Sequence, residues 1–155
     1  MKFLGIDPGV ARIGYAIIEK RNSELKIINS GCIEPRTKNK AKRLEIIFDR
    51  ISDIIKKENP DIVGVENLYF FKNQKTAFAV GEARGVIILA SEMLGKKVFA
   101  PTPLQVKQAL TGYGRAQKIQ VQEMIKKIFR LKNVPKPDDV ADALAVAFWL
   151  ISIVR

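Results

Sequence analysis

Residues 2–19, KFLGIDPGVARIGYAIIE, contain two apolar runs separated by Asp7-Pro8-Gly9. Isoleucine and aromatic residues favour strands, and a Pro-Gly pair turns the chain, so this stretch predicts a β-hairpin. Residues 24–34, ELKIINSGCIE, alternate more weakly between apolar and polar side chains and predict a third strand.

The middle of the chain alternates between helix and strand patterns. From residue 41 to residue 55 apolar side chains recur every three or four positions, which indicates an amphipathic helix. Asn59-Pro60 should end that helix, and residues 61–66, DIVGVE, are typical of a short buried strand. Residues 76–94 predict a second helix, whose face of small side chains permits close packing, and residues 97–100 predict a short strand.

The last third of the chain is mainly helical in pattern. Residues 104–110 predict a brief helix, residues 117–129 a basic helix, and residues 138–153 a helix that is apolar nearly all round and therefore buried. This order of elements predicts an α/β architecture, a mixed sheet with helical cover, in which residues 1–155 form a single domain. The basic stretches 36–42 and 131–137 are expected to be surface loops.

The charge balance favours a polyanionic partner. Lys and Arg total 27, Asp and Glu total 16, and the formal net charge is +11. Such an excess supplies affinity for phosphate backbones, although it can also serve only to keep a protein in solution.

Several kinds of chemistry are excluded by composition. Cys32 is the single cysteine and there is no histidine, so a disulfide framework, a Cys/His zinc site and histidine acid–base catalysis are ruled out. The start of the chain lacks the pattern of a secretory signal, and no uncharged run approaches the roughly 18 residues that span a bilayer. We therefore expect a cytoplasmic protein whose chemistry depends on carboxylates.

Two carboxylates end predicted buried strands. Asp7 ends the first apolar run and Glu66 ends the run at residues 62–66. Taken alone, Asp7 is better explained as a turn former, and Glu66 can be explained as a plain exit into solvent. Because two separate buried strands each end on an acid, we expect the pair to meet a cation or solvent at one edge of the sheet.

Three further acids open the last predicted helix. Asp139 and Asp142 are three residues apart, which places both side chains on one helix face where they can share an ion. Asp138 follows Pro137 and is expected to be the helix N-cap first and a ligand second. Acids near a helix start are also stabilised by the helix dipole, which explains Asp138 and Asp139 without any function but explains Asp142 less well.

Together the acids predict a metal-dependent phosphodiesterase. Asp7, Glu66, Asp139 and Asp142 at one sheet edge would repel one another unless divalent cations neutralised them. Oxygen ligands alone favour Mg²⁺ or Mn²⁺. With a polyanionic partner, the natural chemistry is phosphodiester hydrolysis by two metal ions roughly 3.5–4 Å apart.

Basic and aromatic residues form a second candidate set, for DNA binding. One group directly follows Glu66 and consists of Tyr69, Phe70, Phe71, Lys72 and Lys75; its aromatic side chains stack on bases or on a partner, or partly fold inward. The other group surrounds two glycines in residues 104–130 and consists of Lys107, Arg115, Lys118, Lys126 and Lys127. As a patch they can follow a phosphate backbone, although any one of them can be a solvated side chain.

Four stretches, in order along the chain, resemble one known family: LGIDPGVARIGYAII, VENLYFFKNQKTAFAVGEARGV, APTPLQVKQALTGYGRAQKIQVQEMI and PDDVADALAVA. The family is that of the RuvC-type Holliday-junction resolvases, which are crossover junction endodeoxyribonucleases. The resemblance covers residues 3 to about 148. It implies a ribonuclease H-like fold, with a five-stranded mixed sheet and helices on both faces, and a structure-selective endonuclease acting on four-way DNA junctions.

The resemblance also implies roles and partners. Asp7, Glu66, Asp139 and Asp142 fall on the four acidic metal-binding positions, and Lys107 and Lys118 on basic positions for catalysis or junction contact. Family members are homodimers that nick two strands symmetrically in recombination and repair, in concert with a branch-migration motor. The helix at residues 76–94, with its small-residue face, is our candidate for the dimer contact.

The chain departs from the family pattern in two places. The family is expected to have one wedging aromatic after the glutamate, whereas this chain has Tyr69, Phe70 and Phe71 in a row. Where some relatives use histidine at a metal position, this chain has Asp139. Two other classes compete: actin-like ATPases, which share the hairpin motif but need two such domains, and a DNA-binding module without catalysis, against which the intact acidic quartet argues.

Overall fold

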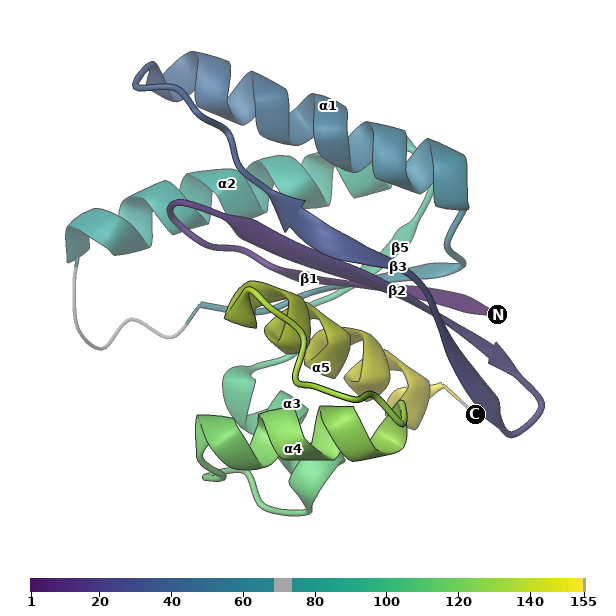
Figure 1. Ribbon diagram of the computed structural model, residues 1–155. Helices are drawn as coiled ribbons and strands as arrows, with labels where there is room; N and C mark the ends of the chain where they lie inside the picture. Colours follow the sequence, from purple (N-terminus) through teal and green to yellow (C-terminus); the bar gives the residue numbers. More distant parts are fainter. Residues whose placement is uncertain (69–73, 155) are drawn as a thin grey trace.

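A five-stranded mixed sheet lies at the centre of the computed structural model, which describes residues 1–68 and 74–154 (Figure 1). The strands are β1 (Lys2–Asp7), β2 (Ile13–Arg21), β3 (Glu24–Ile33), β4 (Ile62–Val65) and β5 (Lys97–Phe99), in the spatial order β3-β2-β1-β4-β5. Strands β1, β2 and β3 pair antiparallel, whereas β4 is parallel to both β1 and β5. The predicted hairpin, third strand and mixed sheet are confirmed.

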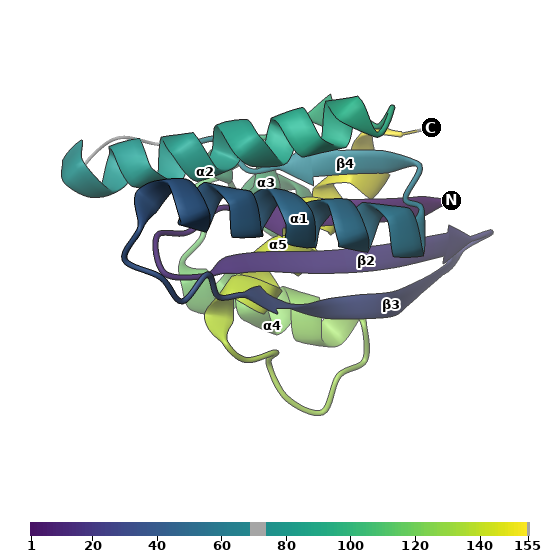
Figure 2. The ribbon, with the colours of Figure 1, turned by 90° about the horizontal axis from the view of Figure 1, so that it is seen from above.

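Helices cover both faces of the sheet, as Figures 1 and 2 show. On one face lie α1 (Lys40–Glu58) and α2 (Gln74–Met93), and on the other lie α3 (Pro103–Thr111), α4 (Lys118–Ile128) and α5 (Asp138–Ile153). Each predicted helix is present, with ends that differ by a few residues. None of the helices in the described ranges has the length and apolar character to cross a membrane.

The alternation of side chains along β1 divides the core into two layers. Leu4 and Ile6 point to one side and pack with side chains of α1 and α2, such as Ile47 and Ile87. Phe3 packs on the other side, among the buried residues of α5. A strand that is apolar on both faces is buried by helices on both faces.

Helix α5 lies unusually close to the hairpin because two glycines face it. A Cβ atom on Gly5 would lie 2.3 Å from both the backbone oxygen of Ala143 and the backbone nitrogen of Ala147. A Cβ atom on Gly14 would lie 1.9 Å from the backbone oxygen of Asp139. Any side chain larger than hydrogen would push the helix away. The two glycines therefore set the distance between the first turns of α5 and the end of β1.

The start of α5 corrects one prediction. The N-cap is Pro137, in an extended conformation with φ −65° and ψ 169°, and Asp138 is already inside the helix, so its predicted role as N-cap is wrong. The Asp138 carboxylate instead accepts a hydrogen bond from Lys136 Nζ at 2.8 Å. Since Pro137 supplies the extended backbone that precedes the helix, the helix starts at Asp138, the first residue of the predicted range.

The small-residue face of α2 also has a different use from the one expected. Ala83, Ile87 and Ala90 are fully buried and pack in the same core layer as α1. This face is therefore occupied within the chain and is not available to a second copy. The prediction that this face makes the dimer contact is therefore wrong, whereas the prediction that the helix takes part in such a contact stays a prediction.

The close approach at Gly5 makes a testable prediction about stability. Gly5→Ala is expected to lower the free energy of unfolding by about 2–3 kcal/mol, because the α5 backbone must move to admit the methyl group. Gly85→Ala, on α2 with nothing within 4 Å of the added Cβ, is the matched control and should raise stability by about 0.5–1 kcal/mol. Urea denaturation measures the free energy of unfolding of both variants. Equal changes in the two variants would show that β1 and α5 are not in tight contact at Gly5.

Candidate metal and nucleic-acid site

Three elements bring acidic side chains to one edge of the sheet. Strands β1 and β4 are parallel neighbours, with Ile6 opposite Val65, so Asp7 and Glu66 leave the sheet side by side. The Glu66 backbone N–H donates to the Ile6 oxygen at 3.0 Å, which extends the pairing by one residue. The first two turns of α5 carry Asp139 and Asp142 to the same edge, because Gly5 and Gly14 let the helix backbone lie against the hairpin.

Asp7 and Glu66 form a buried acidic pair. Burial is the largest cause, and repulsion from Asp142 the second, of a rise in the pKa of Asp7 from 3.8 to about 7. In the same way, burial first and repulsion from Asp7 second are the largest causes of a rise in the pKa of Glu66 from 4.5 to about 8. The two side chains share a hydrogen bond that favours a protonated Glu66 donating to an ionised Asp7. The pair thus resists carrying two negative charges.

The three acids at the start of α5 are paired with cations. Lys118 Nζ, at the start of α4, lies 2.9 Å from Asp142 Oδ2 and 3.5 Å from Asp138 Oδ2. Arg12 Nε, in the β1–β2 loop, lies 3.3 Å from Asp139 Oδ2. Burial raises the pKa of Asp142, and Lys118 opposes that rise. Two basic side chains therefore offset part of the negative charge at this edge.

The donor set fits a divalent cation in its chemistry. All four acids offer hard oxygen ligands, and burial together with repulsion between the acids raises the pKa of Asp7 and of Glu66, so a bound cation would favour their ionised forms. In the parts of the chain that the structure describes, however, no three acidic or cysteine side chains converge as a ready-made metal site. Arg12 and Lys118 each engage one oxygen of Asp139 and of Asp142, so these two ion pairs compete with a metal ion for the carboxylates.

The predicted basic residues divide into near and distant ones. Lys107, half-buried on α3, lies close enough to Glu66 to lower its pKa, and Lys118 contacts Asp142 directly. Arg115 is exposed in the connection between α3 and α4, and Lys126 and Lys127 lie in the last turn of α4. Of the predicted basic residues, Lys107 and Lys118 are thus the ones that lie at the acidic edge.

The aromatic segment cannot be placed in the same way. Tyr69, Phe70, Phe71 and Lys72 lie outside the described residues. The Lys75 backbone belongs to the first turn of α2, and its side chain is likewise outside the description. Their predicted contact with DNA stays a prediction.

Two arginines were missed by the sequence reasoning. Arg12 holds Asp139, and Arg84 Nε donates to the Glu66 backbone oxygen at 3.2 Å, which fixes the point where β4 ends. Arg84 is the single basic residue in residues 76–94, a signal that could have marked it. Arg12 lies two residues before Gly14, the hairpin partner of Asp7, so the hairpin register could have placed it near the acids.

Comparison with known proteins gives one consistent result. Residues 3–149 match the family model of crossover junction endodeoxyribonuclease RuvC. A relative of that name from Clostridioides difficile is 55% identical and covers 95% of this chain and 88% of its own length; one from Halothermothrix orenii is 52% identical, with 95% and 90% covered. The solved structure of Thermus thermophilus RuvC in complex with a Holliday junction substrate matches with a TM-score of 0.89 and 33% identity, covering 96% of this chain and 92% of that one.

The buried acidic pair predicts how stability depends on pH without metal. In the unfolded chain Asp7 and Glu66 ionise near 3.8 and 4.5, whereas in the folded protein their pKa values are about 7 and about 8. Their stabilising contribution is therefore complete below about pH 4 and is lost as pH rises through about 7 and 8. In chelator, Asp7→Asn should raise the free energy of unfolding at about pH 9 by about 1–2 kcal/mol and raise it less at about pH 5.

Thermal denaturation of wild type and Asp7→Asn across that range measures this difference. Asp49→Asn, an exposed acid on α1, is the matched control and should leave the pH dependence unchanged. A pH profile of Asp7→Asn that runs parallel to the wild-type profile would contradict the raised pKa of the pair.

Proposed function

The chain belongs to the family of RuvC crossover junction endodeoxyribonucleases, and from this premise we propose that Asp7, Glu66, Asp139 and Asp142 hold the divalent metal ions with which it cuts four-way DNA junctions. Nucleases of this family hydrolyse phosphodiester bonds and depend on divalent metal ions. The observation that carries the assignment of the site is the meeting of the Asp7–Glu66 pair, with its raised pKa values, and the two acids of α5 at one edge.

We propose two Mg²⁺ ions per site, with Mn²⁺ able to substitute. Bound divalent ions supply an activated water and stabilise the charge on the leaving oxygen. The protein's part is to fix the ligands: Gly5 and Gly14 set the position of α5, and Arg84 holds the backbone of Glu66. Hard oxygen donors without histidine or cysteine support Mg²⁺ over zinc.

Two lysines have proposed roles toward the DNA. Lys118 has a side chain about half exposed, at 52%, and pairs with Asp142, so its ammonium can contact a phosphate at the same edge. Lys107 lies close to Glu66 and can offset charge that develops on the cut phosphate. Arg115 and the segment Tyr69, Phe70, Phe71, Lys72 and Lys75 are proposed to contact DNA farther from the cut.

We propose that two copies act together on one junction. Helix α2 exposes an apolar stripe: Phe78 is 77% exposed, Leu89 54% and Met93 67%. Large apolar side chains in such a row are costly in water and are typical of an interface. A symmetric pair joined at this stripe would present two acidic sites to a junction and nick two strands of like polarity.

The cellular setting follows from the family. We propose that the protein, as one domain over residues 1–155, resolves junctions in homologous recombination and DNA repair together with a branch-migration motor. Its relatives are bacterial enzymes that act on DNA, which supports action in the cytoplasm.

Removing single acids tests the site. Asp7→Asn and Glu66→Gln should reduce cutting of a synthetic four-way junction in Mg²⁺ by at least about a hundredfold, because each removes a proposed metal ligand. Junction binding in chelator should stay intact or rise, since a negative charge near the phosphates is lost. Cutting is measured with end-labelled strands, which also shows whether the nicks are symmetric.

The helix start provides a matched control. Asp139→Asn should abolish cutting, whereas Asp138→Asn, one residue earlier and paired with Lys136, should cut nearly as well as wild type. Equal losses in the two variants would contradict the choice of Asp139 as the ligand. A wild-type protein that binds the junction but does not cut it with any divalent metal would support the DNA-binding module without catalysis.

The exposed stripe on α2 predicts the state of association. Leu89→Glu combined with Met93→Glu should convert a dimer into a monomer of 17.4 kDa in sedimentation experiments, because the added charges would be buried in the interface. Ile119→Glu, on α4 and 64% exposed, is the matched control and should leave the dimer intact. A wild-type monomer at high protein concentration, or a dimer in both variants, would contradict this interface.

A further inference from the structure

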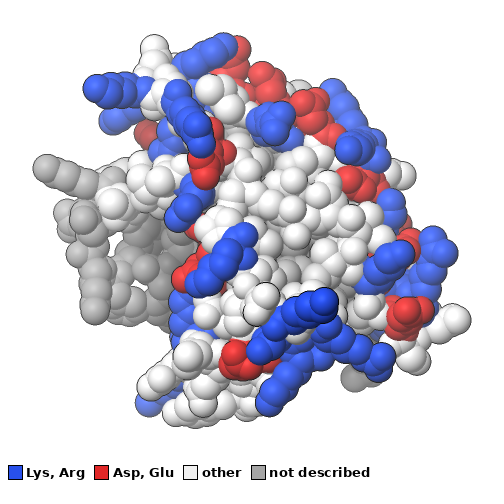
Figure 3. Space-filling view, in the orientation of Figure 1, with Lys and Arg blue, Asp and Glu red and all other residues white. Residues whose placement is uncertain are grey.

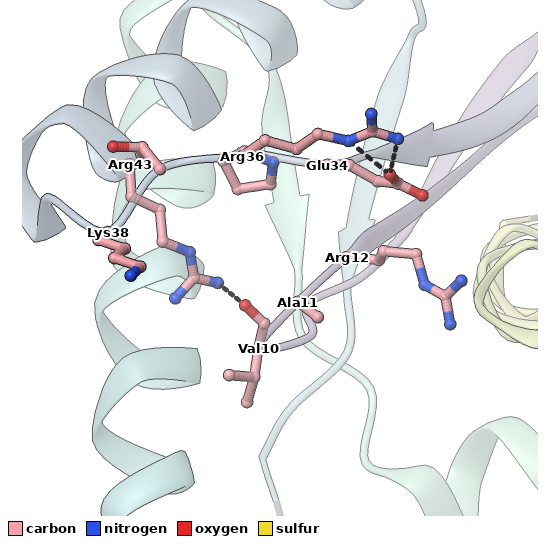
Figure 4. Close-up of a pocket in the computed structure, with 9 residues that line it drawn as sticks. Val10, Ala11, Arg12, Glu34, Arg36, Lys38 and Arg43 are labelled. Atoms are coloured by element: carbon pink, nitrogen blue, oxygen red, sulfur yellow. Dashed lines mark hydrogen bonds and ion pairs between the residues drawn. The ribbon is translucent and has the colours of Figure 1, made fainter.

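A basic hollow lies beside the acidic edge and has no part in the function proposed so far. It has a volume of about 710 Å³ and is formed by the β1–β2 loop at residues 10–12, the segment 34–38 that follows β3, and Arg43 of α1 (Figure 4). The segment belongs to the basic stretch that the sequence predicts as a surface loop. Blue side chains gather in the same region, over the start of α1 at the upper left of Figure 3.

The lining of the hollow is dominated by positive charge. Four of its side chains are cationic and one is acidic: Arg12, Arg36, Lys38 and Arg43 against Glu34. Arg36 is paired with Glu34 at 2.8 Å, whereas the Lys38 ammonium makes no hydrogen bond or ion pair within the described residues. Net positive charge on a concave surface attracts anions.

Arg43 gives the hollow a fixed wall. Its guanidinium donates to the backbone oxygens of Gly9, at 3.2 Å, and of Val10, and so ties the hairpin loop to α1 (Figure 4). The start of α1 lies beside it, with Asn39 as the N-cap that accepts from the Lys42 N–H. The loop is therefore held in place against a helix rather than left free.

The hollow is continuous with the acidic edge through Arg12. This side chain lines the hollow and also contacts Asp139 at 3.3 Å. Gly9, in the same loop, is close enough that a Cβ atom there would lie 3.7 Å from Asp139 Oδ1. A strand whose scissile phosphate lies at the acids would thus place its neighbouring phosphates beside the hollow.

We propose that this hollow binds the phosphate backbone of the DNA strand that flanks the cut, through Arg36, Lys38 and Arg12. The proposal rests on the proposed function, since it takes the acidic edge as the place of cutting. Its lining offers cations but no aromatic side chain to hold a base, and the hollow is open to solvent. A strand supplies phosphates without needing a closed pocket, whereas nucleotide pockets are mostly apolar and enclosed.

The salt dependence of binding tests the contact. The variant Arg36→Gln with Lys38→Gln is compared with Arg21→Gln with Lys26→Gln, in which Arg21, like Arg36, is exposed and pairs with a glutamate two residues earlier. Binding to a four-way junction is measured in chelator, where nothing is cut. The first variant should bind roughly fivefold to tenfold more weakly per lost contact at about 0.1 M salt, with a slope of log K against log salt reduced by about one per contact.

A chemical probe on the DNA locates the contact. Neutral methylphosphonates are placed one at a time at the phosphates on either side of the mapped cut. At one or two of these positions the substitution should weaken binding of wild type and of the Arg21/Lys26 control, and have little effect on the Arg36/Lys38 variant. Equal sensitivity of all three proteins at every position, or equal salt slopes, would overturn the proposal.

A small anion is the competing occupant, and the failures can be told apart. Inorganic phosphate or thymidine monophosphate is added at millimolar concentration, and the NMR signals of Arg36 and Lys38 are followed. If these signals shift while the slope of log K against log salt for junction binding is the same in the variant as in wild type, the hollow is a small-anion site and the DNA assignment is overturned. Wild-type cutting of the junction is measured in parallel. If wild type cuts the junction and the salt slopes of wild type and variant are equal, only the proposed DNA contact at the hollow is refuted. If wild type does not cut, the proposed function itself fails.

Discussion

Backbone contact between α5 and the β1–β2 hairpin determines where the acidic side chains of the site lie. Gly5 and Gly14 leave room for α5 to touch the sheet, and the first turns of the helix then reach the end of β1. The parallel pairing of β1 with β4 adds Glu66 beside Asp7. The acids on β1, on α5 and directly after β4 depend on these two contacts, one between helix and sheet and one between strands.

This arrangement places like charges together in a partly buried edge, which opposes folding. The raised pKa values of Asp7 and Glu66 express that cost, and the ion pairs of Lys118 and Arg12 offset only part of it. Sites that must bind cations commonly give up stability for function. A divalent ion would remove the repulsion, so binding and stability are linked in this protein.

Much of the fold is encoded in local patterns. The hairpin follows from two apolar runs around a Pro-Gly turn, α1 from the three-to-four spacing, and the burial of α5 from a run that is apolar all round. The meeting of Asp7 with Glu66 is also predictable, because each acid directly ends an apolar run and parallel strands end at the same edge.

The features that the sequence does not specify depend on contacts between distant segments. Arg84 and Arg12 act through side chains that cross from one element to another, so the atoms that they contact depend on how distant segments pack. The N-cap of α5 depends on the extended backbone of Pro137, which outweighed the preference of aspartate for that position. The small-residue face of α2 was assigned to a dimer contact although it is buried within the chain, and the apolar side chains on the exposed face of that helix were not recognised.

The central claim is that Asp7, Glu66, Asp139 and Asp142 form one divalent-metal site, and crystals grown with Mn²⁺ test it most directly through anomalous scattering. The account predicts one or two Mn²⁺ peaks in contact with Asp7 and at least two of the other three carboxylates, with Lys118 moved off Asp142. Mn²⁺ bound only elsewhere on the chain, with the Lys118–Asp142 ion pair retained, would contradict it.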